Sequence, residues 1–250
     1  MNRSNYIIIS IASIIVLTSS LLMPVYSQEY SPPHNDPGPA TDTIYFRAFH
    51  MDIAQSELAA GNMDLYFFSL KTAAARELKG DDAVTIIEAP ATTISLILNP
   101  APAIDGELNP LSIKEVRLAL QYAINRDFVA QEIYRGMAVP MLTHVSHTDF
   151  DYLTIYDLVR QTDIKYDPEF ARQIIDKAMS DAGAVKRDGF WYFNEKRIEL
   201  RFIVRVEDER RDIGELFRVE LEKLGFSVTP IYQSFGPAIF TVYGTDPKLF

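Results

Sequence analysis

Residues 144–151 contain side chains that could bind a metal ion or catalyse hydrolysis. His144 and His147 are separated by two residues, and imidazole suits nickel and zinc. Asp149 and Asp151 follow, and paired carboxylates can serve as general acid and general base. A metal site normally needs three or four rigidly held ligands, so the two histidines are only a weak metal candidate. The two acids leave a carboxylate-based hydrolase as the less favoured alternative.

Other catalytic signatures are absent from the sequence. It has no Gly-x-Ser-x-Gly nucleophile motif, no phosphate-binding P-loop and no dinucleotide fingerprint. It also has no cysteine, which excludes disulfides, thiol chemistry and a lipid-modified cysteine. These observations favour a binding protein without a cofactor over an enzyme.

A second polar group, Asn-Arg-Asp at residues 125–127, lies between two predicted helices. Ser112 and Glu115 have the Ser-x-x-Glu spacing of a capping box, which predicts the start of the first helix. Asn125 can cap the second helix with its amide oxygen, and Asp127 places a negative charge in its first turn. We therefore interpret residues 125–127 as a helix junction rather than a binding site. The first helix carries one apolar stripe, formed by Val116, Ala119, Leu120, Ala123 and Ile124.

The composition of the chain is that of an ordinary globular protein. It has 250 residues, of which 48% are hydrophobic and 23% are charged. The net charge of −10 argues against nucleic acid or anionic lipid as a partner, because both are negatively charged themselves.

The amino terminus predicts export. Arg3 precedes a mainly apolar run over residues 7–23, which small and polar residues follow, so residues 1–27 are expected to be a secretory signal. An uncleaved anchor is the alternative, since a membrane span needs about 17 to 25 apolar residues. Residues 28–42 are rich in proline and predict a semi-rigid tether. The folded part is therefore expected outside the cytoplasmic membrane, in the periplasm or at the cell surface.

Beyond the tether, strand and helix patterns alternate, which predicts an α/β protein. Residues 139–157 have no clean period and predict a long surface connection. Asp167 and Pro168 have the types expected at the cap and first position of a helix. Strands are predicted at 43–49, 63–70, 84–90, 93–99 and 226–232, a β-hairpin at 189–206, and helices at 51–60, 72–79, 112–136, 168–182 and 208–224.

Five stretches spread along most of the chain form a recognisable set. They are ELAAGNMDL (57–65), VTIIEAPATTISLILNP (84–100), PLSIKEVRLALQYAINRDFVAQEIYRGMAVP (110–140), YDPEFARQIIDKAMSDAGA (166–184) and RVEDERRDIGELFRVELEKLGFSV (205–228). Taken together and in this order, they resemble the family 5 extracellular solute-binding proteins of ABC importers, which include oligopeptide-, dipeptide- and nickel-binding proteins.

The resemblance implies a type II periplasmic-binding-protein fold with two lobes around a cleft. Residues 43–100 would form part of the first lobe and residues 110–250 part of the second, so the chain is expected to be truncated relative to the family. The implied function is to capture a solute, here a peptide, between the lobes and to deliver it to a membrane permease with a separate ATPase. A ligand-free cell-envelope scaffold, or a non-functional remnant of the same fold, is the alternative.

The resemblance also implies that one turn between a strand and a helix faces the ligand. Arg205, Glu207, Asp208 and Glu209 occupy this turn. Their charges could pair with the termini of a peptide, and helix N–H groups would favour a ligand carboxylate. The alternative for Asp208 is that it caps the following helix.

Two further residues are implied as ligand contacts. Asn99 ends a predicted first-lobe strand where the family has an asparagine near the cleft, although a turn-forming asparagine before Pro100 is equally consistent with the sequence. Phe235 follows a predicted strand where the family often places a side chain against the ligand. An ordinary core aromatic is the alternative for Phe235.

Overall fold

The structure is a computed structural model that describes residues 38–39, 41–89, 92–103 and 106–244. The chain divides into two units, residues 1–48 and residues 49–250. The predicted signal, residues 1–27, and most of the predicted tether lie outside the described residues. Among the residues that are described, no helix is both long and apolar enough to cross a membrane.

Two short helices follow the start of the second unit. They are α2 (Met51–Ala59) and α3 (Thr72–Leu78), at the positions predicted for them. Polar side chains join the two helices: Gln55 donates to Glu77 at 2.7 Å, and Lys71 pairs with Asp52 at 2.5 Å.

The four predicted strands between residues 43 and 99 are wrong. The structure assigns no strand to the described residues of 43–49, 63–70, 84–90 and 93–99. Several of their large apolar side chains are exposed, including Phe68 (66%) and Ile87 (85%). Alternation of apolar and polar residues gives an extended segment two faces, but a strand also needs a neighbouring strand to accept and donate its backbone hydrogen bonds.

The predicted helix pair over 112–136 forms, with a different start. The helix α4 (Lys114–Ala123) follows a 3₁₀ turn, η1 (Pro110–Ser112), and the N-cap residue of α4 is Ile113. The predicted capping box is therefore wrong, because Ser112 belongs to the 3₁₀ turn and its hydroxyl donates to the Asn109 carbonyl at 2.7 Å. The stripe on α4 is confirmed for Val116, Ala119, Leu120 and Ala123, all of which are buried.

The junction after α4 confirms the predicted cap. The Asn125 side chain accepts the N–H of Phe128 at 2.9 Å and so begins α5 (Arg126–Phe128). A π-helical turn, η2 (Val129–Ile133), continues α5 and ends near Gly136. The positive φ of Gly136, 80°, is the left-handed conformation expected after a helix.

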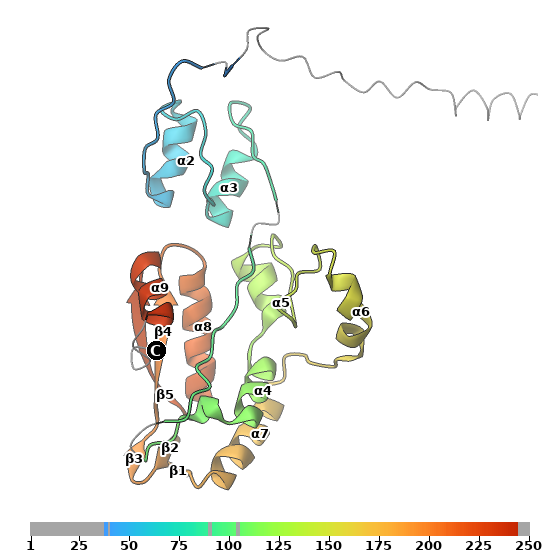
Figure 1. Cartoon of the computed structure of the whole chain (residues 1–250), viewed down its shortest axis with the longest axis vertical. Coiled ribbons are helices and arrows are strands. Elements are labelled where there is room, and N and C mark those ends of the chain that lie inside the picture. Colours follow the sequence, from blue (N-terminus) through green and yellow to red (C-terminus); the bar gives the residue numbers. More distant parts are fainter. Residues whose placement is uncertain (1–37, 40, 90–91, 104–105, 245–250) are drawn as a thin grey trace, which may run out of the picture. The chain divides into compact units, whose positions relative to one another are not determined.

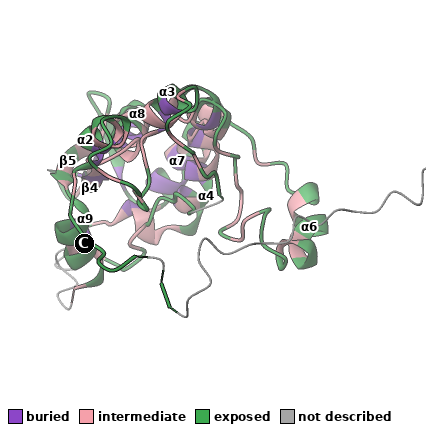
Figure 2. Cartoon of the chain, turned by 90° about the horizontal axis from the view of Figure 1, so that it is seen from above, coloured by how far each residue is buried: buried purple, intermediate pink, exposed green. Residues whose placement is uncertain are grey.

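One helix was missed. Helix α6 (Tyr152–Gln161), which has no buried residue, begins inside the stretch 139–157 that was predicted as a connection and extends beyond it. Tyr152, Ile155 and Val159 are its half-buried positions and have helical spacing, but the exposed Leu153 and Leu158 interrupt the pattern in the sequence. In Figure 2 this helix is mostly exposed or intermediate.

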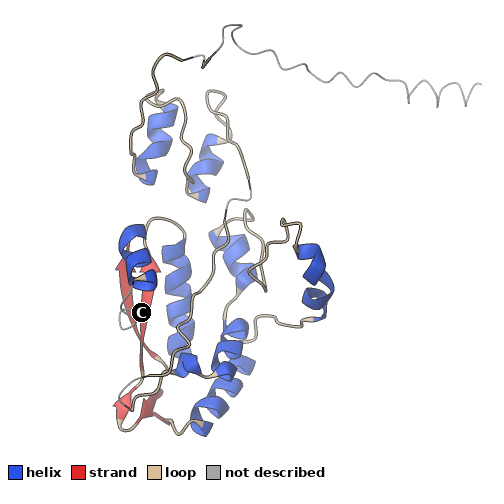
Figure 3. Ribbon diagram, in the orientation of Figure 1, coloured by secondary structure: helices blue, strands red, loops and turns tan. Residues whose placement is uncertain are grey.

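The remaining helices and strands form a packed α/β region (Figures 1 and 3). Asp167 accepts the N–H of Phe170 at 2.9 Å and caps α7, as predicted. The elements are α7 (Pro168–Asp181), β1 (Val185–Arg187), β2 (Phe190–Phe193), β3 (Lys196–Arg197), β4 (Glu199–Arg205), α8 (Arg210–Lys223), β5 (Ser227–Gln233) and α9 (Phe235–Tyr243).

The predicted hairpin forms between β2 and β3, but its second strand continues as β4 into another sheet, where β4 pairs with β5, the strand predicted at 226–232. In the first sheet, β1, β2 and β3 pair in an antiparallel order. In the second, β4 and β5 are parallel over seven residue pairs, from Glu199 opposite Ser227 to Arg205 opposite Gln233. Helix α8 connects these parallel strands and packs beside them (Figure 1), so β4, α8 and β5 form a βαβ unit. The predicted α/β class is confirmed, and the two lobes remain a prediction.

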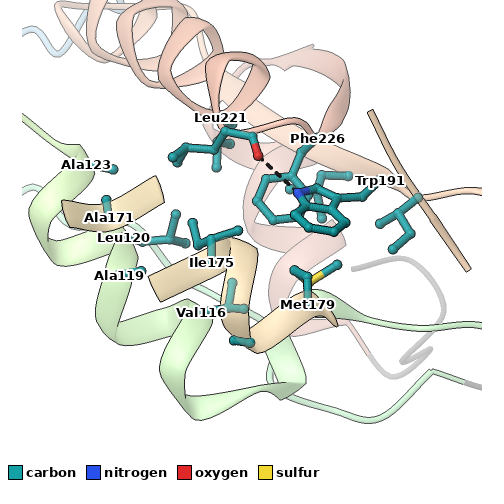
Figure 4. Packing of buried hydrophobic residues seen from close by; sticks show 14 of the residues in the cluster. Val116, Ala119, Leu120, Ala123, Ala171, Ile175, Met179, Trp191, Leu221 and Phe226 are labelled. Atoms are coloured by element: carbon teal, nitrogen blue, oxygen red, sulfur yellow. Dashed lines mark hydrogen bonds between the residues drawn. The ribbon is translucent and has the colours of Figure 1, made fainter. Parts of the chain in front are cut away.

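The core lies between α4, α7, α8 and the strands. Figure 4 shows Val116, Leu120 and Ile175 close to one another, with Trp191 and Phe226 at the other side of the cluster. Trp191 is 2% exposed, and its indole N–H donates to the Leu224 carbonyl at 3.1 Å, the dashed line in Figure 4. This bond satisfies the polar atom of the one tryptophan while its rings fill the core.

Candidate ligand-binding site

The candidate site lies at the carboxyl ends of two parallel strands. Because Arg205 of β4 is opposite Gln233 of β5, the turn 206–209 after β4 and the start of α9 after β5 lie at the same edge of the sheet. In α/β proteins, ligands generally bind beyond the carboxyl ends of parallel strands. The sheet therefore positions the predicted turn residues and Phe235 together.

Arg205, Glu207 and Phe235 form one contact group. The Arg205 Nε donates to Glu207 Oε2 at 2.8 Å, and the Arg205 guanidinium carbon lies 4.7 Å from the centre of the Phe235 ring. The other Glu207 oxygen accepts the backbone N–H of Phe235. Burial acts to raise the pKa of the Glu207 carboxyl, but the hydrogen bonds from Arg205 and Phe235 outweigh it, so that the pKa lies below its usual value. Glu207 is thus a carboxylate that fixes both neighbours.

Phe235 is not a core aromatic. It is 57% exposed, at the first position of α9, with its ring against the Arg205 guanidinium. The alternative interpretation of Phe235 as an ordinary core residue is therefore wrong. An exposed ring that is held by a guanidinium presents an apolar surface next to a charged one, which suits a ligand that has both.

Asp208 pairs with Arg210 and supports the start of α8. The Asp208 carboxylate accepts the backbone N–H of Arg210 at 3.1 Å and its Nε at 2.7 Å. Burial acts to raise the pKa of Asp208, but the Arg210 hydrogen bonds outweigh it and hold the pKa below its usual value. Arg210 is the first residue of α8, so Asp208 does contribute to capping, although Glu209 occupies the cap position.

Glu209 makes its contact far away in the sequence. Its Oε1 accepts the backbone N–H of Thr72, the first residue of α3, at 2.6 Å. The negative charge of Glu209 also affects Tyr134, at the end of η2. Burial, and then the carboxylates of Glu209 and Asp208, raise the pKa of Tyr134 to about 12. Glu209 therefore links the turn after β4 to helix α3.

Asn99 occupies a separate turn. Its Oδ1 accepts the N–H of Ala101 at 3.0 Å, and its carbonyl accepts a hydrogen bond from the Asn109 side chain. This is the turn geometry that was the alternative for Asn99. Glu107, in the same loop, pairs with Lys196 of β3 at 3.1 Å. This loop therefore lies near the start of β4 rather than near its end.

The histidine and aspartate stretch is an exposed loop. His144 and His147 are both exposed, and Asp149 accepts the N–H of Ser146 at 3.0 Å, which closes a local turn. Within the part of the chain that the structure describes, no group of three or more His, Asp or Glu side chains is arranged to hold a metal ion.

The helix junction at 125–127 borders a small pocket of about 160 Å³. Asn125 and Phe128 line it from one side, and Leu216, Phe217 and Glu220 of α8 line it from the other. Since the Asn125 amide oxygen caps α5, the structural interpretation of this asparagine holds.

Sequence reasoning missed three residues of the turn's surroundings: Arg210, Tyr134 and Thr72. The Asp-x-Arg spacing of Asp208 and Arg210 was a usable signal for a local pair. Tyr134 and Thr72 carried no such signal, because each reaches the turn through the tertiary fold.

The chain matches a family model over residues 28–241, described as bacterial extracellular solute-binding proteins, family 5 Middle. Heme-binding protein A of Haemophilus influenzae is 24% identical over 177 residues, which are 70% of this chain and 28% of the relative.

Solved structures of similar fold come from several bacteria. An oligopeptide-binding protein of an ABC transporter from Thermotoga maritima is 25% identical with a TM-score of 0.57, covering 79% of this chain and 37% of that one. AppA of Bacillus subtilis, in complex with a nonapeptide, is 18% identical with a TM-score of 0.56, over 76% and 36%. NikZ of Campylobacter jejuni, in complex with Ni(L-His), is 19% identical with a TM-score of 0.55, over 78% and 36%.

The chain thus spans little more than a third of the length of these solved relatives, and its described residues match part of their fold. The family model covers most of the chain, and the α/β fold agrees with it. The chain belongs to family 5 of the bacterial extracellular solute-binding proteins, a family of binding proteins rather than enzymes.

Proposed function

We propose that this chain is the exported solute-binding component of an ABC importer and that it binds a peptide-type ligand at the turn after β4. The observation that carries the proposal is the contact of Arg205 with the exposed Phe235 ring, with Glu207 holding both. Charged and aromatic groups meet at the carboxyl edge of the parallel strands, where a ligand has open access to the ring.

A peptide fits this chemistry. Its backbone and termini offer hydrogen bonds and charges, and its apolar side chains can pack on an exposed aromatic ring. AppA, of similar fold, is solved with a nonapeptide, whereas NikZ is solved with a nickel–histidine complex and the H. influenzae relative is named for heme. Imidazole groups suit nickel, and His, Cys, Met or Tyr side chains hold heme iron, whereas the charged and aromatic groups gathered around Phe235 are partners of the kind that a peptide needs.

In this proposal, transport follows from family membership. The bound peptide is passed to the permease subunits of the importer, and ATP is hydrolysed by a separate subunit. The function requires export of the chain to the outer side of the cytoplasmic membrane, to which the predicted signal at residues 1–27 would direct it. The charged residues Asp208 and Glu209, in the same turn as Glu207, are proposed to lie near the ligand, whereas Asn99 lies in its separate turn.

Isothermal titration calorimetry tests the proposal. The purified chain is titrated with a tryptic digest and then with single peptides from the fractions that release heat. The Phe235→Ala variant is compared with Phe240→Ala, because Phe240 is a second exposed aromatic of α9. We expect binding by wild type and Phe240→Ala, and at least tenfold weaker binding by Phe235→Ala.

Two results would count against the proposal. Absence of heat with every peptide would favour the ligand-free scaffold. Equal affinity in the two variants and the wild type would place the peptide away from Phe235.

A further inference from the structure

The backbone N–H of Thr72 donates to Glu209 across 137 positions of the sequence, with a donor–acceptor distance of 2.6 Å. Thr72 is the first residue of α3 and is 8% exposed, and the cap position before it, Lys71, makes no side-chain capping bond. The first N–H groups of a helix have no partner within the helix. Glu209 therefore gives α3 the acceptor that a local capping residue normally supplies.

The helix pair α2 and α3 depends on such contacts more than the rest of the second unit does. The main buried cluster, as far as the chain is described, contains no residue of α2 or α3. Met51, Ala54 and Leu78 are the buried apolar residues of the pair. A seven-residue helix is too short to be stable by itself in water, so contacts outside the helix must hold it in place.

A second polar contact joins the pair to the region that follows α4. Arg76 of α3 donates to the carbonyl of Arg135 at 3.3 Å, just after η2. Both contacts are made to backbone groups, so neither depends on a pair of matched side chains. Of the two, the Glu209 contact is the shorter and involves a carboxylate, which makes it the stronger.

We propose that Glu209 is a latch that holds the α2–α3 pair to the start of α8. When the Glu209–Thr72 bond breaks, the pair moves away as a unit while the core around α4, α7 and α8 stays folded. Glu209 directly follows Glu207 and Asp208, so a change in this turn is transmitted to α3 through a single hydrogen bond. The proposal rests on the Glu209–Thr72 contact, with the longer Arg76–Arg135 contact as a second and weaker link, and it does not require a ligand.

Amide hydrogen exchange, read by mass spectrometry on the full chain, tests the latch. Three variants separate its parts. Glu209→Ala removes the acceptor, whereas Glu209→Gln keeps an oxygen acceptor at the same place. Thr72→Pro removes the donor without straining the helix, because proline suits the first helical position and Lys71 has the extended backbone, φ −59° and ψ 142°, that precedes proline readily.

We expect faster exchange in α2 and α3, about fivefold, in both Glu209→Ala and Thr72→Pro, which is the size of effect that a lost helix cap produces. The double variant should exchange no faster than either single variant, because both remove the same bond. Glu209→Gln should lie close to wild type, and α4, α7 and α8 should be unchanged in every variant.

Unchanged exchange in α2 and α3 would overturn the latch, and so would additive effects in the double variant. Faster exchange throughout α4 and α7 would also overturn it, since the contact would then support the whole fold. Should Glu209→Ala fail to fold, that outcome contradicts a local latch too, and Thr72→Pro still reports on the bond independently.

Discussion

The guanidinium of Arg205 lies over the ring of Phe235, 4.7 Å from its centre, although the two residues are 30 positions apart. The parallel pairing of β4 and β5 creates this contact, since it brings the end of each strand to the same edge. Glu207 then fixes the geometry by accepting from both residues. An exposed aromatic ring is thereby held in one orientation, which is what a recognition surface requires.

Replacing Phe235 with leucine should lower the free energy of unfolding by about 0.5 to 1 kcal/mol, because the contact between cation and ring is lost while an apolar side chain remains. Urea unfolding followed by circular dichroism measures the change. Phe240→Leu is the control, since Phe240 is exposed on the same helix. An equal loss in both variants would mean that the Arg205 contact contributes nothing measurable.

Gly214 allows α8 to approach β4. A Cβ atom at this position would lie 2.5 Å from Val204 Cγ1, so Gly214→Ala should destabilise the protein by about 1 to 3 kcal/mol, even though alanine favours helix. Gly236→Ala in α9 is the matched control, because a Cβ there meets no atom within 4 Å.

The clash at Gly214 has a further check. Adding Val204→Ala should restore part of the stability that Gly214→Ala removes, since it deletes the atoms that the new methyl group meets. Independent, additive losses in the double variant would show that the helix and strand are not packed as described.

Asn125→Ala should lower stability by about 0.5 to 2 kcal/mol, because the Phe128 N–H loses its acceptor. Asn125→Ser keeps an oxygen that can cap and should retain most of the stability. Asp127→Ala should cost an amount within the same range if the acid supports the first turn of α5. Chemical unfolding of the three variants distinguishes these effects, and lost ligand binding at unchanged stability would contradict the structural role.

Asp208 should make the protein sensitive to acid. Its pKa is lower in the folded state than its ordinary value of 3.8, so the unfolded chain takes up the proton first as the pH falls. The stability from this group is present above about pH 4 and is lost as the pH drops through the folded-state pKa.

Urea unfolding at pH 7, 4 and 3 measures this dependence. The difference in the free energy of unfolding between wild type and Asp208→Asn should become smaller toward pH 3. Asp163→Asn serves as control, since the Asp163 side chain is 88% exposed. A difference for Asp208→Asn that stays constant with pH would show that its ion pair with Arg210 does not act in this way.

Local signals in the sequence predicted most helices of this protein correctly. The Asp167 cap, the Asn125 cap and the glycine at 136 each act through neighbours in the chain, so their residue types are sufficient. Ser112 shows how such a signal fails. The Asn109 side chain accepts the Leu111 N–H at 3.0 Å and so caps a 3₁₀ turn that includes Ser112, and α4 therefore starts two residues later, at Lys114.

Strand pairing could not be read in the same way. The stretch 63–70 has the alternation of a strand but forms none, while 197–206, predicted as one hairpin strand, divides into β3 and β4 in different sheets. Pairing is set by partners elsewhere in the chain, which a local pattern does not contain.

The sequence predicted where the candidate site lies better than it predicted which residues contact one another there. The turn 205–209 came from the family resemblance, and the fold brings Phe235 to it. The link from Glu209 to Thr72 depends on the tertiary arrangement of two helices, for which the sequence offers no spacing rule.

The most direct test of the proposed function is the thermal unfolding of the purified chain with and without a mixed peptide digest. A ligand that binds only the folded state raises its stability by RT ln(1 + [L]/Kd), so a binding protein predicts a higher Tm with peptide. This rise should persist in Phe240→Ala and disappear in Phe235→Ala. A cooperative transition whose Tm does not change with peptide would contradict peptide binding by this chain.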